Sequence, residues 1–130
     1  MPRKVLRPKS LSFQPRPTYP YSPGAKSGHI VCTAGQVAWN SEGKMVGVGD
    51  VRAQTEQTLK NVQSVLAEAG ASFSDVLKCN VYLADMRYFQ QMNEVFAKFF
   101  PKDPPARTTV EARLAEPEML VEIEAIAYIE

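Results

Sequence analysis

One arginine is placed where it could do chemistry. Arg107 lies in the segment PPARTTVEARL (residues 104–114), at the start of a stretch with the residue types of a β-strand. Small or apolar residues surround it, among them Ala106 and Val110. A planar guanidinium can donate two parallel hydrogen bonds to a carboxylate, which fixes both the charge and the orientation of that group. Such an arginine either pairs with a carboxylate of the protein or holds the carboxylate of a ligand.

Most standard catalytic sites are absent from the sequence. His29 is the only histidine, so histidine-rich metal sites are excluded and a Ser–His–Asp triad would depend on that residue alone. There is no G-x-S-x-G or Walker A motif, and the glycines of GKMVGVGD (residues 43–50) are better interpreted as hairpin and bulge residues. Arg107, several carboxylates, tyrosines and backbone amides remain. These groups can bind a carboxylate and position a water, which suits hydrolysis of an already activated substrate.

Composition sets the class of protein. The 130 residues are the size of one domain, 45% of them are hydrophobic, and the net charge is +1, so no overall field attracts nucleic acid. The apolar runs are too short to span a bilayer. Cys32 and Cys79 lie far apart in apparent strands, which favours two buried free thiols in a reducing compartment, the cytoplasm.

The first third of the chain is basic. No Asp or Glu precedes Glu42, whereas six basic residues do: Arg3, Lys4, Arg7, Lys9, Arg16 and Lys26. A transit peptide would need an amphipathic helix, which the prolines in residues 1–20 would break. We therefore expect a short edge strand around Val5 followed by an extended Pro-rich arm, within a single domain over residues 1–130.

The remaining elements follow from residue periodicity. Helical spacing predicts a helix to Ala69, capped by Asp50 and ended by Gly70. A second helix is predicted over residues 86–100, with Asp85 as its cap and an apolar stripe that belongs to the core. Strands are predicted over residues 29–37, 78–83, 106–114 and 120–129. This order indicates an α+β domain with two helices on one face of a mixed sheet.

The last strand has one face of mixed character. Its opposite side is uniformly apolar, but Leu120, Glu122, Glu124, Ile126 and Tyr128 combine carboxylates with large apolar groups. Such a face is typical of an oligomer interface or a pocket wall. If residues 115–119 close a hairpin, Ala112 faces Glu122 and Arg107 lies roughly 17 Å from Glu122 along the strands. The two could then meet only if a second subunit supplied one of them.

Several segments together resemble a known family. PYSPG, TAGQV, QTEQTLKNVQSVLAEAGASFSDVLKCNVYLADM, MNEVFAKFF, PPARTTVEARL and VEIEAIA occur in the order and spacing of the Rid (YjgF-type) enamine/imine deaminases, over about residues 21–128. The resemblance implies a chorismate-mutase-like fold and a homotrimer with a central barrel and intersubunit sites. It also implies cofactor-independent hydrolysis of reactive 2-imino or enamine acids to 2-keto acids and ammonia.

The resemblance also suggests site residues. Arg107 matches the arginine that holds the substrate carboxylate, and Glu122 the glutamate that activates or orients water; either could instead be an ion-pair residue. Further matches in the substrate cleft are Tyr21, Gly35 as a backbone donor, and Asn93. Thr109 and Ala34 stand where many members have cysteine and serine.

Three alternatives to a housekeeping deaminase follow from the same residues. PARTTV is similar to the version in aminomuconate-type deaminases, which suggests a pathway-specific substrate. A regulatory module that binds a small carboxylate would need Arg107 but not Glu122. The RNA cleavage attributed to some relatives is disfavoured by the near-neutral charge and the single histidine.

Overall fold

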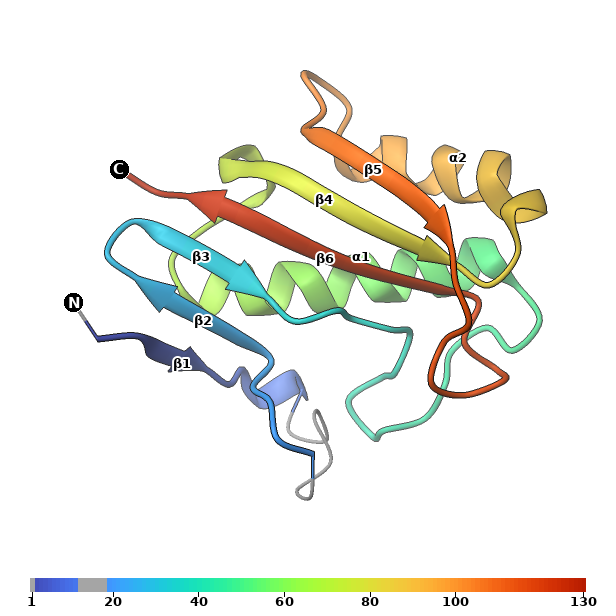
Figure 1. Cartoon of the computed structure of the whole chain (residues 1–130), viewed down its shortest axis with the longest axis horizontal. Coiled ribbons are helices and arrows are strands. Elements are labelled where there is room, and N and C mark those ends of the chain that lie inside the picture. Colours follow the sequence, from blue (N-terminus) through green and yellow to red (C-terminus); the bar gives the residue numbers. More distant parts are fainter. Residues whose placement is uncertain (1, 12–18) are drawn as a thin grey trace.

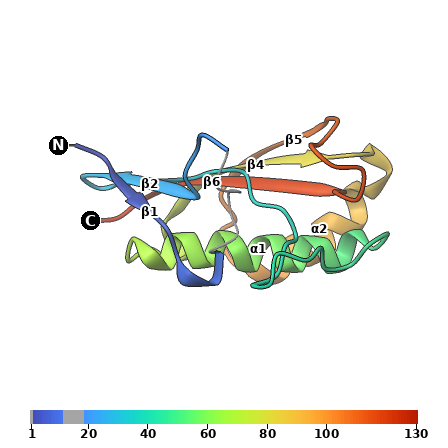
Figure 2. The same ribbon diagram turned by 90° about the horizontal axis from the view of Figure 1, so that it is seen from below.

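A six-stranded sheet forms one layer of the molecule, and two helices form the other (Figures 1 and 2). The computed structural model describes residues 2–11 and 19–130. The strands are β1 (Lys4–Leu6), β2 (Gly24–Ser27), β3 (Ile30–Thr33), β4 (Val76–Leu83), β5 (Ala106–Glu111) and β6 (Val121–Tyr128), in the spatial order β1-β2-β3-β6-β4-β5. Short 3₁₀ turns occur at Lys9–Leu11, Phe73–Asp75 and Met86–Tyr88. The α+β prediction, with both helices on one face, is confirmed.

The longer helix, α1 (Val51–Glu68), begins after Asp50 as predicted and ends one residue before the expected Ala69. The Asp50 side chain caps its first turn by accepting a hydrogen bond from the backbone N–H of Ala53 at 3.1 Å. Leu59, Val62 and Leu66 are fully buried against the sheet. Gly70 has φ 81°, a left-handed conformation that glycine adopts at little cost and that ends the helix.

The second helix, α2 (Phe89–Phe99), begins three residues later than predicted. Residues Met86–Tyr88 form a 3₁₀ turn instead, and Asp85 caps it by accepting from the backbone N–H of Arg87 at 2.8 Å. Met92 and Phe96 are buried, as expected for a core stripe.

The predicted hairpin between the last two strands is wrong. β4 lies between β5 and β6: it pairs with β5 in parallel, Cys79 opposite Arg107, and with β6 antiparallel, Tyr82 opposite Glu122. The reason is the β4–α2–β5 crossover, because a helix that connects two strands normally returns the chain parallel to its starting strand. The estimate of 17 Å along one ladder therefore does not apply.

The two faces of the sheet differ sharply in character. One face packs on the helices through Cys79 and Val81 of β4 and alternate residues of β6, all buried. The opposite, open face carries the exposed apolar side chains Val5, Ile30, Val110, Ile126 and Tyr128, each 37–53% exposed. The mixed face expected for β6 is thus part of a larger uncovered surface.

Some expectations for the N-terminal half need correction. β2 was not predicted, and β3 is shorter than the expected residues 29–37, because the chain leaves the ladder after Thr33. Cys79 is buried as expected, but Cys32 points to the open face and is exposed. The expected strand around Val5 is present, while residues 12–18 of the predicted arm lie outside the described residues. No helix within the described ranges is long and apolar enough to cross a membrane.

Candidate functional site

Arg107 is held between a helix and a strand. Because it pairs with buried Cys79 in the β4–β5 ladder, its side chain points to the helix face of the sheet. Nη2 donates a hydrogen bond to Oδ1 of Asn93 at 2.6 Å, and the guanidinium lies over the rings of Phe96 and Phe89, 4.8 Å and 5.7 Å from their centroids. The planar group is therefore fixed on one edge by the amide and on its faces by aromatic contacts.

The charge of Arg107 has no partner of opposite sign within the described residues. No carboxylate lies within ion-pair distance, in contrast to Arg52, which pairs with Glu94 at 2.8 Å. Burial lowers the pKa of the Arg107 guanidinium, although an arginine remains charged at neutral pH. A half-buried and oriented cation without a counter-ion among the described residues is well suited to receive an anionic ligand.

Glu122 lies on the open face beside Gly35. The Gln36 N–H donates to the Ile123 carbonyl at 2.8 Å and the Ile123 N–H to the Gln36 carbonyl at 3.0 Å, which holds the segment after β3 against β6. A Cβ added to Gly35 would overlap the Glu122 carboxylate, so a glycine is required for this approach. Gly35 and Glu122 were both predicted site residues, and the structure brings them together.

A pocket of about 510 Å³ opens around this pair. Its walls are Tyr19, Tyr21, Ala34, Gly35, Val37, Trp39, Ala115, Glu116, Met119 and Glu122. Burial, and then the neighbouring Glu124, raise the pKa of Glu122 above its ordinary value. Burial and the Glu122 charge likewise raise the pKa of Tyr21, which places its hydroxyl in the electrostatic range of that carboxylate. The pocket thus holds a carboxylate with increased basicity beside a phenol.

The predicted site residues form two groups on opposite faces of one sheet. Arg107, Asn93 and Thr109 belong to the helix face, since Thr109 pairs with buried Val81. The second group, which contains Glu122, belongs to the open face. Arg107 and Glu122 therefore point to opposite faces of the sheet within one chain, and it stays a prediction that a second subunit brings such a pair together.

Sequence reasoning missed two contributions to the site. Phe89 and Phe96 were assigned to the core, yet they also contact the guanidinium of Arg107. Their positions four residues before and three after Asn93 put them on the same side of α2, which is the signal that could have revealed them. The second is the hydrogen bond from the Tyr82 hydroxyl to Glu124 at 2.8 Å, next to Glu122 on the open face. Among the described residues, no group of three or more His, Cys, Asp or Glu side chains is arranged to bind a metal ion.

Comparison with known proteins defines the class. The model of the family described as endoribonuclease L-PSP matches residues 12–129. A RutC family protein of Pyrococcus horikoshii is 43% identical over 116 residues, 89% of this chain and 92% of the relative. The 3-aminoacrylate deaminase RutC of Acinetobacter baylyi is 33% identical over 129 residues, 99% of this chain and all of the relative.

Solved structures agree with this class. The Rid family protein YyfA of Yersinia pestis is 32% identical, with a TM-score of 0.88 over 98% of this chain and 100% of that one. The YjgF gene product of E. coli is 30% identical, with a TM-score of 0.86 over 98% and 99%. E. coli TdcF, solved with bound serine, is also 30% identical with a TM-score of 0.86, over the same shares. The chain belongs to the YjgF-type Rid family, and the chorismate-mutase-like fold expected from the sequence is confirmed.

Proposed function

We propose that this protein hydrolyses 2-imino or enamine acids to 2-keto acids and ammonia. The observation that carries the proposal is Arg107, an oriented and half-buried guanidinium with no carboxylate partner among the described residues. It would bind the substrate carboxylate through two parallel hydrogen bonds. The deaminase relative named above supports the class of reaction.

The second half-site supplies the water chemistry. Glu122 accepts a proton from a water whose oxygen attacks the imine carbon, while the imine nitrogen takes up a proton, giving a carbinolamine. The protonated Glu122 then gives its proton to the amino nitrogen of that intermediate and takes the proton of the hydroxyl group, so that the C–N bond breaks and ammonia leaves with a 2-keto acid. The raised pKa of Glu122 makes it a stronger base than an exposed carboxylate. An enamine substrate first takes a proton at carbon to become the imine.

Both half-sites can act on one molecule only if chains associate. We infer a cyclic homotrimer in which Arg107 of one chain meets Glu122 of the next, with the apolar open face buried at the interfaces. A cyclic arrangement would give three equivalent sites, each built by two chains.

Subunit mixing tests this arrangement directly. Arg107→Ala and Glu122→Gln chains should each be inactive alone. When they are mixed in equal amounts, unfolded and refolded together, about a quarter of the sites should combine an intact Arg107 with an intact Glu122. Recovery of about a quarter of wild-type turnover would support shared sites. Complete inactivity of a mixture that light scattering shows to be trimeric would contradict them.

A second candidate is a module that senses a small carboxylate without turning it over. It is favoured by the Arg107 half-site, which suffices for binding, and by a relative solved with serine. Glu122→Gln separates the two functions, because it keeps the size of the side chain but removes its basicity. An enzyme should lose turnover and still bind 2-oxobutyrate in calorimetry, while Glu68→Gln, the same change at an exposed residue at the end of α1, should retain full turnover. Unchanged hydrolysis by Glu122→Gln would rule out its assigned role.

A further inference from the structure

Two buried amide side chains lie on one side of α1. Gln54 is 0% exposed and Asn61 is 4% exposed, so neither is accessible to a ligand or to another chain. They are about two helical turns apart, roughly 10 Å along the axis, which places them on the same side of the helix. Neither side chain lines the Glu122 pocket. Each instead binds the backbone of a segment that forms a wall of that pocket.

Gln54 holds the chain at the start of β6. Its Oε1 accepts a hydrogen bond from the backbone N–H of Leu120 at 2.9 Å. Its Nε2 donates to the backbone carbonyls of Glu118 at 2.8 Å and of Gly47 at 3.1 Å. β6 begins at the residue after Leu120, and Glu122 is its second residue. Gln54 therefore fixes the point from which the strand that carries Glu122 starts.

Asn61 holds a second wall of the pocket. Its Nδ2 donates to the backbone carbonyls of Val37 and Trp39, both at 2.8 Å. Its Oδ1 accepts from Nε2 of Gln57 at 2.9 Å, which orients the amide so that both of its N–H groups point to the two carbonyls. Val37 and Trp39 both line the pocket. Asn61 thus ties this wall to the same helix that holds the start of β6.

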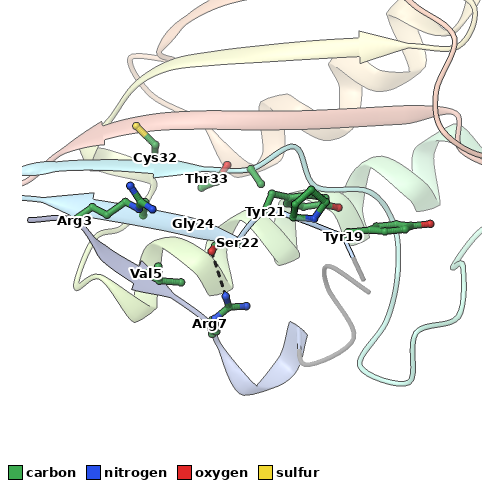
Figure 3. Close-up of a pocket in the computed structure, with 12 residues that line it drawn as sticks. Arg3, Val5, Arg7, Tyr19, Tyr21, Ser22, Gly24, Cys32 and Thr33 are labelled. Carbon is green, nitrogen blue, oxygen red and sulfur yellow. Dashed lines mark hydrogen bonds between the residues drawn. The ribbon is translucent and has the colours of Figure 1, made fainter. Parts of the chain in front are cut away.

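The two walls held by α1 pack on each other. Val37, Trp39 and Met119 form a buried apolar cluster that is separate from the main core. The remaining wall is formed by Tyr19 and Tyr21, which lie on the segment that leads into β2 and are about half exposed (Figure 3). The buried part of the pocket is therefore fixed by side chains of α1, on the opposite side of the sheet from the pocket itself.

From these contacts we propose that Gln54 and Asn61 are positioning residues for the hydrolytic half of the site. They act through the start of β6 and the segment after Gly35, and so set where the Glu122 carboxylate lies relative to the imine carbon. The inference rests on the proposed function, which gives Glu122 the water chemistry. Misplacement of a reacting group by about 1 Å costs up to about a hundredfold in rate. Binding of the substrate carboxylate by Arg107, on the other face of the sheet, should not depend on these amides.

Apolar replacements of similar size test the proposal in the imine hydrolysis assay. In Gln54→Met and Asn61→Leu, kcat should fall about ten- to a hundredfold, while KM stays within about twofold of wild type. Gln57→Met removes the bond that orients the Asn61 amide; it is the milder variant and should lower kcat about three- to tenfold. Val62→Ala is the matched control, because it removes buried core atoms from the same helix but the valine side chain makes no hydrogen bond to the pocket walls. Its kcat should equal that of the wild type at a temperature where all variants are folded.

The single tryptophan of the chain gives an independent measurement of the pocket wall. Trp39 lines the pocket and is 8% exposed, so its fluorescence reports how well that wall is held. Quenching of this fluorescence by acrylamide should increase in folded Asn61→Leu and, to a smaller extent, in Gln57→Met. It should stay at the wild-type level in Val62→Ala, which destabilises the helix without releasing the wall.

The outcomes separate this inference from the proposed function. An equal loss of kcat in Val62→Ala and in the amide variants, or a rise in KM with kcat unchanged, would overturn the positioning role and leave the deaminase intact. Unchanged quenching in Asn61→Leu would also overturn it, because the wall would then be held without the amide. Absence of hydrolysis by the wild-type protein would reject the deaminase itself, and the quenching of Trp39 would still decide whether α1 holds the pocket wall.

Discussion

Replacement of Arg107 by lysine keeps the positive charge but removes the planar group. The guanidinium has one hydrogen bond to Asn93 at 2.6 Å and lies over the ring of Phe96, while further donors remain for a ligand. An ammonium group is a point charge on a flexible stem and cannot reproduce that orientation. Loss of one charge-assisted hydrogen bond and of the bidentate geometry costs about 3 kcal/mol, or roughly a hundredfold in kcat/KM.

The assay is imine hydrolysis by Arg107→Lys, with Arg52→Lys as the control at an exposed ion pair. Asn93→Ala should lower the rate by about tenfold, because it removes one orienting bond and leaves the cation in place. The double variant should be little worse than Arg107→Lys alone, since Asn93 acts through Arg107. Near-full activity of Arg107→Lys would show that the carboxylate binds elsewhere. Additive losses in the double variant would show that Asn93 does not act by positioning the guanidinium.

Further predictions concern the second half-site and the cysteines. Gly35→Ala should displace the Glu122 carboxylate and lower kcat by about a hundredfold while keto-acid binding persists; unchanged kcat would refute that contact. Turnover should rise as pH increases through the raised pKa of Glu122. Because the pKa of Glu122 is raised in the folded protein, folding favours the protonated side chain. The stabilisation of the folded protein by protonated Glu122 is therefore complete below the ordinary pKa of a glutamate and is lost as pH rises through the raised pKa. Glu122→Gln should therefore increase the melting temperature at pH 7 but not at pH 4; equal shifts would contradict this. Burial raises the pKa of Cys79 to about 11, so Cys79 should resist thiol reagents at pH 8. Cys32 is exposed in the single chain and should react only when the chains are dissociated. Rapid labelling of Cys32 in a trimer would argue against burial of the open face.

Helices and strands could be predicted from the sequence because caps, glycine stops and residue alternation depend only on neighbouring residues. Asp50 and Gly70 mark the two ends of α1, and the alternation of residues in β4 and β6 identifies their buried sides correctly. The order of strands depends instead on the crossover through α2. A strand, a helix and another strand in succession favour a parallel pair. Applied to β4, α2 and β5, this rule predicts the observed parallel pairing of β4 with β5, in place of a hairpin between β5 and β6.

The candidate site was predictable only in part. The segment around Arg107 and the glutamate-rich last strand stood out in the sequence, and the family likeness extended the set to Gly35 and Asn93. The opposite orientation of Arg107 and Glu122 could not be derived, because it depends on the parallel register of Cys79 with Arg107. The contact of Phe89 with the guanidinium was missed for a similar reason: an apolar stripe on a helix serves the core and a cation equally well.

The two outermost strands of the sheet are poor templates for strand addition. β1 has only three residues, and prolines at positions 2 and 8 stand on either side of it. Pro104 and Pro105 precede β5 at the other edge. Proline has no N–H to donate, and short strands beside prolines resist pairing with another chain. Edge-to-edge growth into fibrils is thereby disfavoured even at high protein concentration. The ring proposed above would then form through the broad surface of the sheet and not through its edges.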